Sequence, residues 1–123
     1  MAKEIVSTDQ APKPGGPYST AVVANGFAFL AGQTPKRPDG SKVEGSFTEE
    51  CEQVFDNLEA VANACGGSLH DAVKVSVFLR DFADFPELNR IFAERFGDHP
   101  PARTTVPADL PGFSIEVDVI LAL

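Results

Sequence analysis

Two stretches of the chain carry hydrophobic residues at the spacing of an amphipathic helix. The first starts with a capping box of Ser46 and Glu49, ends at two glycines, and repeats hydrophobic residues at alternating steps of four and three: Phe47, Cys51, Val54, Leu58, Val61 and Cys65. The second repeats the capping pattern at Asp84, has a proline in its first turn, stops at Gly97, and carries Leu88, Phe92 and Phe96. We therefore expect two helices, each with one buried face.

Shorter hydrophobic runs predict the strands. Residues 21–24 and 27–31 are apolar and are separated by Asn25 and Gly26, the pair best suited to a type I′ hairpin turn. Residues 71–80 alternate, with one apolar face of Val73, Val75, Val77 and Leu79. Residues 115–121 alternate in the same way, with a face of Ile115, Val117, Val119 and Leu121. Further short strands are expected at about 3–6 and at 103–106.

This order of elements predicts an α+β domain in which two helices cover one face of a single sheet. Residues 1–123 have the length of a single domain, and 43% hydrophobic residues can supply its core. Phe78 and Ile120 lie on strand faces that point away from the helices, among polar residues. Such a face is either solvated or buried in an oligomer, and the pattern alone leaves both open.

Charge narrows the range of partners. The chain has 10 Lys and Arg against 18 Asp and Glu, a net charge of −8, and only Lys36 and Arg37 are adjacent cations. Without a basic stripe, we expect neither nucleic acid nor an anionic membrane as a partner. No stretch approaches the length of a membrane span, and the N-terminus lacks the hydrophobic core of a signal peptide, so we expect a cytoplasmic protein.

Cysteine and histidine positions do not indicate a disulfide or a metal site. Cys51 and Cys65 fall within one predicted helix, and at about 1.5 Å rise per residue they lie ~21 Å apart, too far for a disulfide. Free thiols suit a reducing compartment. His70 and His99 have no cysteine or carboxylate cluster at ligand spacing, so we expect no metal.

Residues 100–106, Pro-Pro-Ala-Arg-Thr-Thr-Val, are the most informative candidate for chemistry. Arg103, preceded by prolines and followed by hydroxyls, is either a bidentate clamp for a substrate carboxylate or the partner of one of the many acids. Glu116 and Asp118 share one face of the last strand, so their proximity either raises one pKa for acid–base chemistry or serves only solubility. No phosphate-binding loop occurs, so a nucleotide cofactor has no support.

Several segments in order along nearly the whole chain closely resemble the RidA (YjgF/YER057c/UK114) family: 16–19, 31–35, Asn57 and Leu58, 75–81, Asn89, 101–104 and 115–117. The Pro-Ala-Arg segment with a later Ile-Glu is the most specific of these motifs. The resemblance implies a chorismate-mutase-like mixed β-sheet with two helices packed on one face. It also implies a homotrimer with three ligand clefts between subunits, which agrees with the mixed sheet face.

The resemblance further implies hydrolytic deamination of reactive 2-enamine and 2-imine acids of the 2-aminoacrylate and iminopyruvate type. The products are 2-keto acids and ammonia, no cofactor is needed, and the role is control of metabolite damage. Arg103 would hold the substrate carboxylate and Glu116 would orient or activate the attacking water. The remaining cleft residues implied by the resemblance are Tyr18, Gly32, Asn89 and Thr105.

Three departures from the family pattern keep other functions open. Thr105 stands where deaminases commonly have cysteine, and Ala31 where many have serine, so a non-catalytic trimer that binds or senses small keto acids remains an alternative. Asp109 stands where a small or basic residue is more usual, and its charge would disfavour a second negative charge on the ligand.

A ribonuclease or translation inhibitor fits poorly with a net charge of −8. A deaminase of one catabolic pathway, for example for an aminomuconate-like compound, also stays open, because pocket shape decides it.

Overall fold

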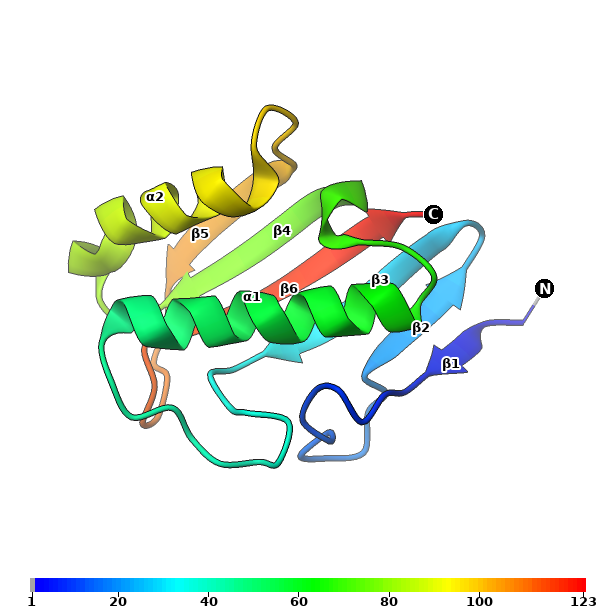
Figure 1. The fold of residues 1–123 in the computed structure, drawn as a ribbon, viewed down its shortest axis with the longest axis horizontal. Coiled ribbons are helices and arrows are strands. Elements are labelled where there is room, and N and C mark those ends of the chain that lie inside the picture. Colours follow the sequence, from blue (N-terminus) through cyan, green and yellow to red (C-terminus); the bar gives the residue numbers. More distant parts are fainter. Residues whose placement is uncertain (1) are drawn as a thin grey trace.

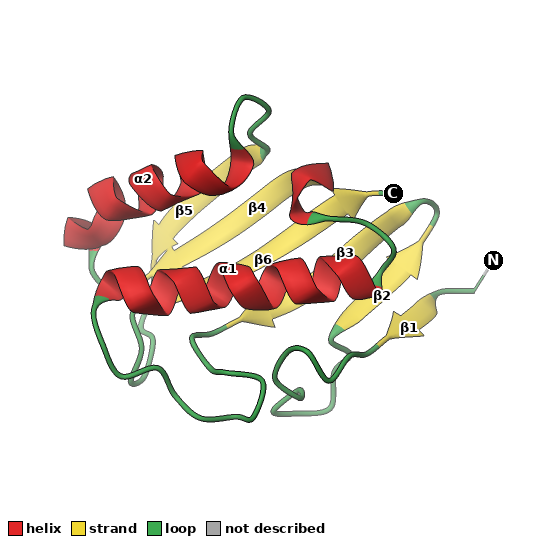
Figure 2. Cartoon of the chain, in the orientation of Figure 1, coloured by secondary structure: helices red, strands yellow, loops and turns green. Residues whose placement is uncertain are grey.

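The computed structural model describes residues 2–123 and forms one sheet with two helices on the same face (Figure 1, Figure 2). The strands are β1 (Glu4–Val6), β2 (Ala21–Ala24), β3 (Phe27–Gln33), β4 (Ala72–Leu79), β5 (Ala102–Pro107) and β6 (Ile115–Ala122). The helices are α1 (Phe47–Ala64) and α2 (Phe85–Phe96), with short 3₁₀ turns at Leu69–Asp71 and Phe82–Asp84. The α+β prediction, with a mixed sheet and both helices on one face, is confirmed.

The sheet has six strands in the order β1-β2-β3-β6-β4-β5. Every neighbouring pair is antiparallel except β4 and β5, which are parallel. Helix α2 makes the crossover between these two strands and lies along β5 at the edge of the sheet, while α1 crosses its middle (Figure 1). A parallel neighbour needs such a crossover, so the helix and the edge strand are placed together by topology.

Local sequence signals account for the predicted turns and caps. Asn25 and Gly26 have φ values of 52° and 80°, as a type I′ turn requires. At the start of α1, the Ser46 hydroxyl accepts a hydrogen bond from the Glu49 backbone, and the Glu49 carboxylate accepts one from the Ser46 backbone, at 3.2 and 3.1 Å. Gly66 follows the helix with a φ of 90°, which favours glycine.

Two sequence predictions were wrong in detail. Val73 is 43% exposed rather than buried, because the register of β4 against β6 shifts between Ala72 and Lys74, and Ala72 takes the buried position. Such an irregularity inserts one residue and reverses the alternation locally. Asp84 makes no side-chain cap, because it lies in the 3₁₀ turn whose cap is Asp81, which accepts a hydrogen bond from the Ala83 backbone at 2.9 Å.

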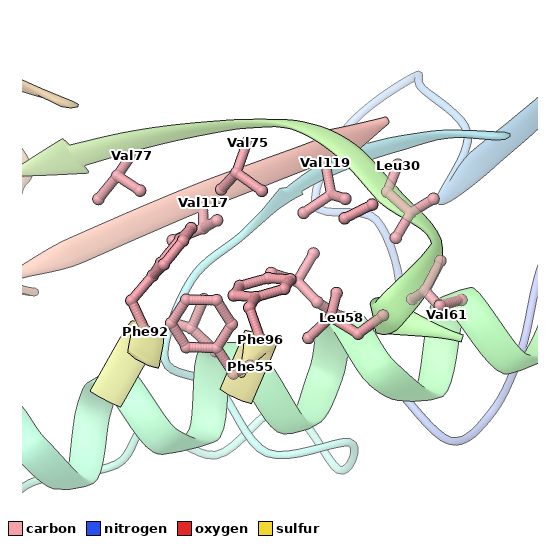
Figure 3. Close-up of a cluster of buried hydrophobic side chains, with 14 of the residues drawn as sticks. Leu30, Phe55, Leu58, Val61, Val75, Val77, Phe92, Phe96, Val117 and Val119 are labelled. Carbon is pink, nitrogen blue, oxygen red and sulfur yellow. The ribbon is translucent and has the colours of Figure 1, made fainter. Parts of the chain in front are cut away.

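The core between the helices and the strands contains a cluster of aromatic rings among aliphatic side chains. Phe55 of α1 makes edge-to-face contacts with Phe92 and Phe96 of α2, with ring centroids 6.2 and 6.0 Å apart. Figure 3 shows these rings beneath Val75 and Val77 of β4 and the valines of β6. The alternating residues predicted for β6, namely Ile115, Val117, Val119 and Leu121, are all buried here. This cluster fixes α2 relative to the sheet.

Polar contacts on the outer side also hold α2 against α1. Arg95 donates to the carboxylates of Glu52 and Asp56 at 2.6 and 2.9 Å. Thr48 of α1 donates to Glu87 of α2 at 2.5 Å. Charged pairs of this exposure each contribute little, but together they add to the aromatic packing.

The face of the sheet that is turned away from the helices carries large apolar side chains. Phe27 and Phe29 of β3 are 41% and 46% exposed, and Val106 of β5 is exposed as well. Phe78 and Ile120 lie on the same face and are half-buried, as the alternation predicted. We call this surface, made of Phe27, Phe29, Phe78, Val106 and Ile120, the open face.

We predict that Phe55→Ala lowers the free energy of unfolding by about 3–5 kcal/mol, because it removes a fully buried ring from the aromatic cluster and leaves a cavity. Urea denaturation followed by circular dichroism measures this change. Val73→Ala is the control, because this exposed side chain should change stability by no more than about 0.5 kcal/mol. A loss of less than about 1 kcal/mol in Phe55→Ala would contradict the assigned packing.

Candidate functional site

Arg103 on β5 is held under α2 by neutral groups. Its Nη2 atom donates a hydrogen bond to the Asn89 side-chain oxygen at 2.8 Å. Its guanidinium carbon lies 4.8 Å from the ring centroid of Phe92 and 5.4 Å from that of Phe85. An amide and two aromatic faces orient the guanidinium without neutralising its charge.

Arg103 takes part in none of the ion pairs found in residues 2–123, which are formed by Arg90 and Arg95. The alternative that Arg103 simply pairs with an acid of the same chain is therefore wrong. Burial lowers the pKa of Arg103, but a guanidinium stays protonated at neutral pH. A half-buried cation with neutral partners retains donors for an anion such as a carboxylate.

Helix periodicity explains how α2 supplies these partners. Phe85, Asn89 and Phe92 are spaced at i, i+4 and i+7, which places them on one face of α2. Arg103 pairs with Val75 in the parallel ladder, so its side chain lies on the helix-covered face of the sheet. Thr105 is two residues further along β5 on the same face, and its buried hydroxyl has no hydrogen-bond partner among the described residues. Arg103, Asn89 and Thr105 thus form one group.

Gly32 is the centre of a second group, because it lines a cleft together with Tyr18 and is closely approached by Glu116. A cleft of about 200 Å³ lies over β3, and its lining includes Tyr18, Ala31 and Gly32. A Cβ atom at Gly32 would lie 3.2 Å from Cδ of Glu116 and closer still to its Oε2 atom. Only glycine allows the carboxylate to approach the β3 backbone so closely. Tyr18 is 55% exposed, and its hydroxyl accepts a hydrogen bond from the Gly15 backbone at 3.2 Å.

The pKa of Glu116 is raised above that of an ordinary glutamate. Burial is the larger cause, and the nearby Asp118 carboxylate is the smaller one. Both act in the same direction, because a low dielectric and a neighbouring negative charge each disfavour the ionised form. The predicted interaction between these two acids is therefore present, but burial contributes more than proximity.

The two groups lie on opposite faces of the sheet. Glu116 is paired with Phe78 and shares the open face, since its neighbours Ile115 and Val117 are buried under the helices. Arg103 lies on the helix face of β5. Side chains on a strand alternate between faces, so one chain does not bring Arg103 and Glu116 to the same point.

Sequence reasoning missed two aromatic partners of Arg103. The sequence pattern marks Phe92 only as a residue on the buried face of the helix and gives Phe85 no role. Their i, i+4, i+7 spacing with Asn89 was the available signal, but it has meaning only once β5 is known to lie beneath α2. Lys13 and Lys36, which also line the cleft, carried no signal in the sequence.

Other candidate chemistry finds no support in the described part of the chain. Cys51 and Cys65 are free, and burial raises the pKa of the Cys51 thiol to about 12, so this thiol is neutral and unreactive. Residues 2–123 contain no cluster of three or more His, Cys, Asp or Glu placed to hold a metal ion. No helix in the same range is long and apolar enough to cross a membrane.

Comparison with known proteins defines the family. Residues 8–123 match the family model described as endoribonuclease L-PSP. The chain belongs to this family, which is the YjgF/RidA family that its motifs resemble.

Similar proteins carry different names. A RutC family protein of Pyrococcus abyssi is 45% identical over 107 residues, covering 86% of this chain and 84% of the relative. A 2-iminobutanoate/2-iminopropanoate deaminase of Dermatophagoides farinae is 40% identical over 124 residues, covering 98% and 97%. The Saccharomyces cerevisiae protein MMF1, named mitochondrial, is 43% identical over 117 residues, covering 94% and 81%. The crystal structure of yeast Mmf1 superposes with a TM-score of 0.94, covering 98% of each chain at 40% identity.

We predict that Asp118→Asn lowers the pKa of Glu116, because it removes the neighbouring negative charge. The pKa should remain above that of an exposed glutamate, since burial is unchanged. Carboxyl titration by NMR measures this value. Asp98→Asn, in the exposed loop after α2, removes the same charge elsewhere and should leave Glu116 unaffected. An unchanged Glu116 pKa in Asp118→Asn would show that the two carboxylates do not interact.

Proposed function

We propose that this protein hydrolyses 2-imino and 2-enamino acids of the 2-aminoacrylate and iminopyruvate type to 2-keto acids and ammonia. The observation that carries the proposal is Arg103, a half-buried guanidinium held by neutral groups and without an acid partner in the described chain. The mite relative named as a deaminase supports it. We infer that the physiological role is the removal of reactive metabolites.

Arg103 binds the carboxylate that these substrates share. Its planar fork matches a carboxylate in a bidentate arrangement, and the hydrogen bond to Asn89 leaves donors free for it. The rings of Phe85 and Phe92 restrict rotation of the guanidinium, so little conformational entropy is lost on binding. Thr105 lies two residues beyond Arg103 on the same face of β5, so in this proposal it lines the substrate site next to Arg103. Asn89 and Arg103 thus orient the reacting carbon.

Glu116 positions and deprotonates the attacking water. The oxygen of water forms a bond to the electrophilic imine carbon while Glu116 takes one water proton, and this proton passes to nitrogen to give a carbinolamine. The hydroxyl proton of the carbinolamine then passes to the same nitrogen, the carbonyl forms, and the carbon–nitrogen bond breaks to release ammonia. The raised pKa of Glu116 makes it a better proton acceptor than an exposed glutamate. Gly32, which the Glu116 carboxylate approaches, lines a cleft together with Tyr18, and in this proposal the two enclose the reacting group. Orientation and proton transfer suffice, because an imine needs no covalent nucleophile.

We propose that the active site forms between copies of the chain in a homotrimer. Arg103 and Glu116 occupy opposite faces of one sheet, so a site containing both requires a second subunit. The open face supplies apolar surface for the contact, with Phe27 and Phe29 among its exposed residues. A cyclic trimer contains three equivalent clefts of this kind.

Thr105 favours one alternative, a trimer that binds keto acids without turnover. Its hydroxyl replaces the thiol common in deaminases and is buried without a partner among residues 2–123. Binding of 2-ketobutyrate without any acceleration of imine hydrolysis would support this alternative.

We also propose a cytoplasmic location and no nucleic-acid or membrane partner. Two free cysteines and a net charge of −8 support this part of the proposal. Because one yeast relative is named mitochondrial, the mitochondrion is the alternative location to test.

We predict that Arg103→Ala reduces imine hydrolysis by about 100-fold or more, because the substrate carboxylate loses its only positioned cation. Arg103→Lys should also be impaired, since an ammonium lacks the planar fork. The assay generates imines with an L-amino-acid oxidase and follows semicarbazone formation with and without the protein. Arg80→Ala is the control for loss of one arginine. Full activity of Arg103→Ala with an intact oligomer would refute the role of Arg103.

We predict that Arg103→Ala and Glu116→Gln subunits complement each other. Mixed trimers are prepared by refolding the two variants together, and each contains one cleft that has both Arg103 and Glu116. Because an equal mixture also forms unmixed trimers, one cleft in four is intact, and the mixture recovers about a quarter of wild-type activity. Each variant refolded alone should stay inactive. If the mixture is also inactive although mass spectrometry shows mixed trimers, the site does not combine these residues from two subunits.

A further inference from the structure

Two lysines stand on the rim of the cleft that contains Tyr18 and Gly32. Lys13 lies in the proline-rich loop before β2, and Lys36 lies just after β3, yet both line the cleft. The two also line a neighbouring hollow together with Asp39. Segments distant in sequence thus place two positive charges at one opening.

The backbone near Lys36 is anchored rather than loose. The buried Asn57 of α1 donates a hydrogen bond to the Lys36 carbonyl at 2.7 Å. Lys36 also forms an isolated bridge with Lys42. The Lys42 ammonium lies 3.0 Å from the position that a Cβ atom would take at Gly112, next to Phe113, which lines the cleft. A third cation is therefore close to the same opening.

These lysines are not neutralised by the acids of their own chain. None of them takes part in an ion pair within residues 2–123, although the chain carries a net charge of −8. Asp9 and Asp39 line the adjacent hollows but not the cleft, and the hydrogen bonds that the Asp39 carboxylate accepts, at 2.9 and 2.7 Å, come from Ser41 rather than from a lysine. Local positive potential against an acidic background selects for an anionic group.

Asp109 does not oppose this potential within one chain. It is exposed in the loop after β5 and is not among the residues that line the cleft. The expectation that its charge disfavours a second negative charge on the ligand stays a prediction, because the proposed site lies between copies of the chain.

We propose that Lys13 and Lys36 bind a second carboxylate at the far end of the substrate, so the preferred substrates are 2-imino dicarboxylates. This inference rests on the proposed function and its site between copies, in which Arg103 of one copy holds the first carboxylate beside the cleft of another. A substrate with a neutral side chain would leave both lysines unpaired, whereas the distal carboxylate of a dicarboxylate substrate pairs with them at the opening. Lys13 and Lys36 are specificity-determining residues and take no part in the hydrolysis itself.

The test compares two imines made by amino-acid oxidases, one from glutamate and one from methionine. The variants are the wild type, Lys13→Gln/Lys36→Gln, and Lys3→Gln as a control that removes a lysine outside the cleft. We expect the ratio of kcat/KM for the glutamate imine to that for the methionine imine to fall about fivefold or more in the double variant, since each exposed charge pair is worth about a two- to fivefold effect. The Lys3→Gln ratio should equal that of the wild type. In 1 M salt the wild-type preference should shrink.

Binding of stable keto acids separates this inference from the proposed function. Calorimetry with 2-oxoglutarate and 2-oxobutyrate should show the same loss of preference in the double variant even if no imine is hydrolysed, in which case only the deaminase proposal fails. If imines are hydrolysed but both ratios are unchanged in the double variant, the cationic rim has no role in selectivity. The inference would likewise be overturned if the wild type bound 2-oxobutyrate more tightly than 2-oxoglutarate.

Discussion

The packing of Phe92 connects the core of this protein to its candidate chemistry. One part of the ring contacts Phe55 and Phe96 in the aromatic cluster that joins the helices, and its face lies 4.8 Å from the guanidinium of Arg103. The parallel pairing of β4 and β5 makes this contact possible, because the crossover helix must lie over the edge strand. The packing of Phe92 in the core therefore restricts the orientation of Arg103.

The alternation of side chains along the strands divides the functional residues between two surfaces. Arg103 and Thr105 share the helix face of β5, whereas Glu116 shares the open face with exposed phenylalanines. Each surface of a single chain is thus incomplete. Arg103 has no acidic partner among the described residues, and the apolar open face is not covered by other parts of the chain. Association of identical chains would meet both requirements at once, which is why we propose that the activity depends on a trimer.

Burial has different effects on the charges of Arg103 and Glu116. Desolvation acts on both Arg103 and Glu116, but it leaves the arginine charged and makes the glutamate a stronger base. The lysines at the rim are exposed and act over a longer range, so they influence which substrate enters rather than how it reacts. Substrate choice within one fold depends on the side chains around the site, and charges at such a rim are one physical means of setting it.

The sequence alone determined the helices, the Asn25-Gly26 hairpin, the buried face of β6 and the motif around Arg103, because these depend on short-range spacing and on local backbone preferences. It failed at Val73 and Asp84, where a strand irregularity and an added 3₁₀ turn depend on neighbouring segments. Only the tertiary structure decided that Arg103 lies under Asn89, that Gly32 admits Glu116, and that these pairs occupy opposite faces. Strand order and register set these distances, and both arise from packing between residues far apart in the chain.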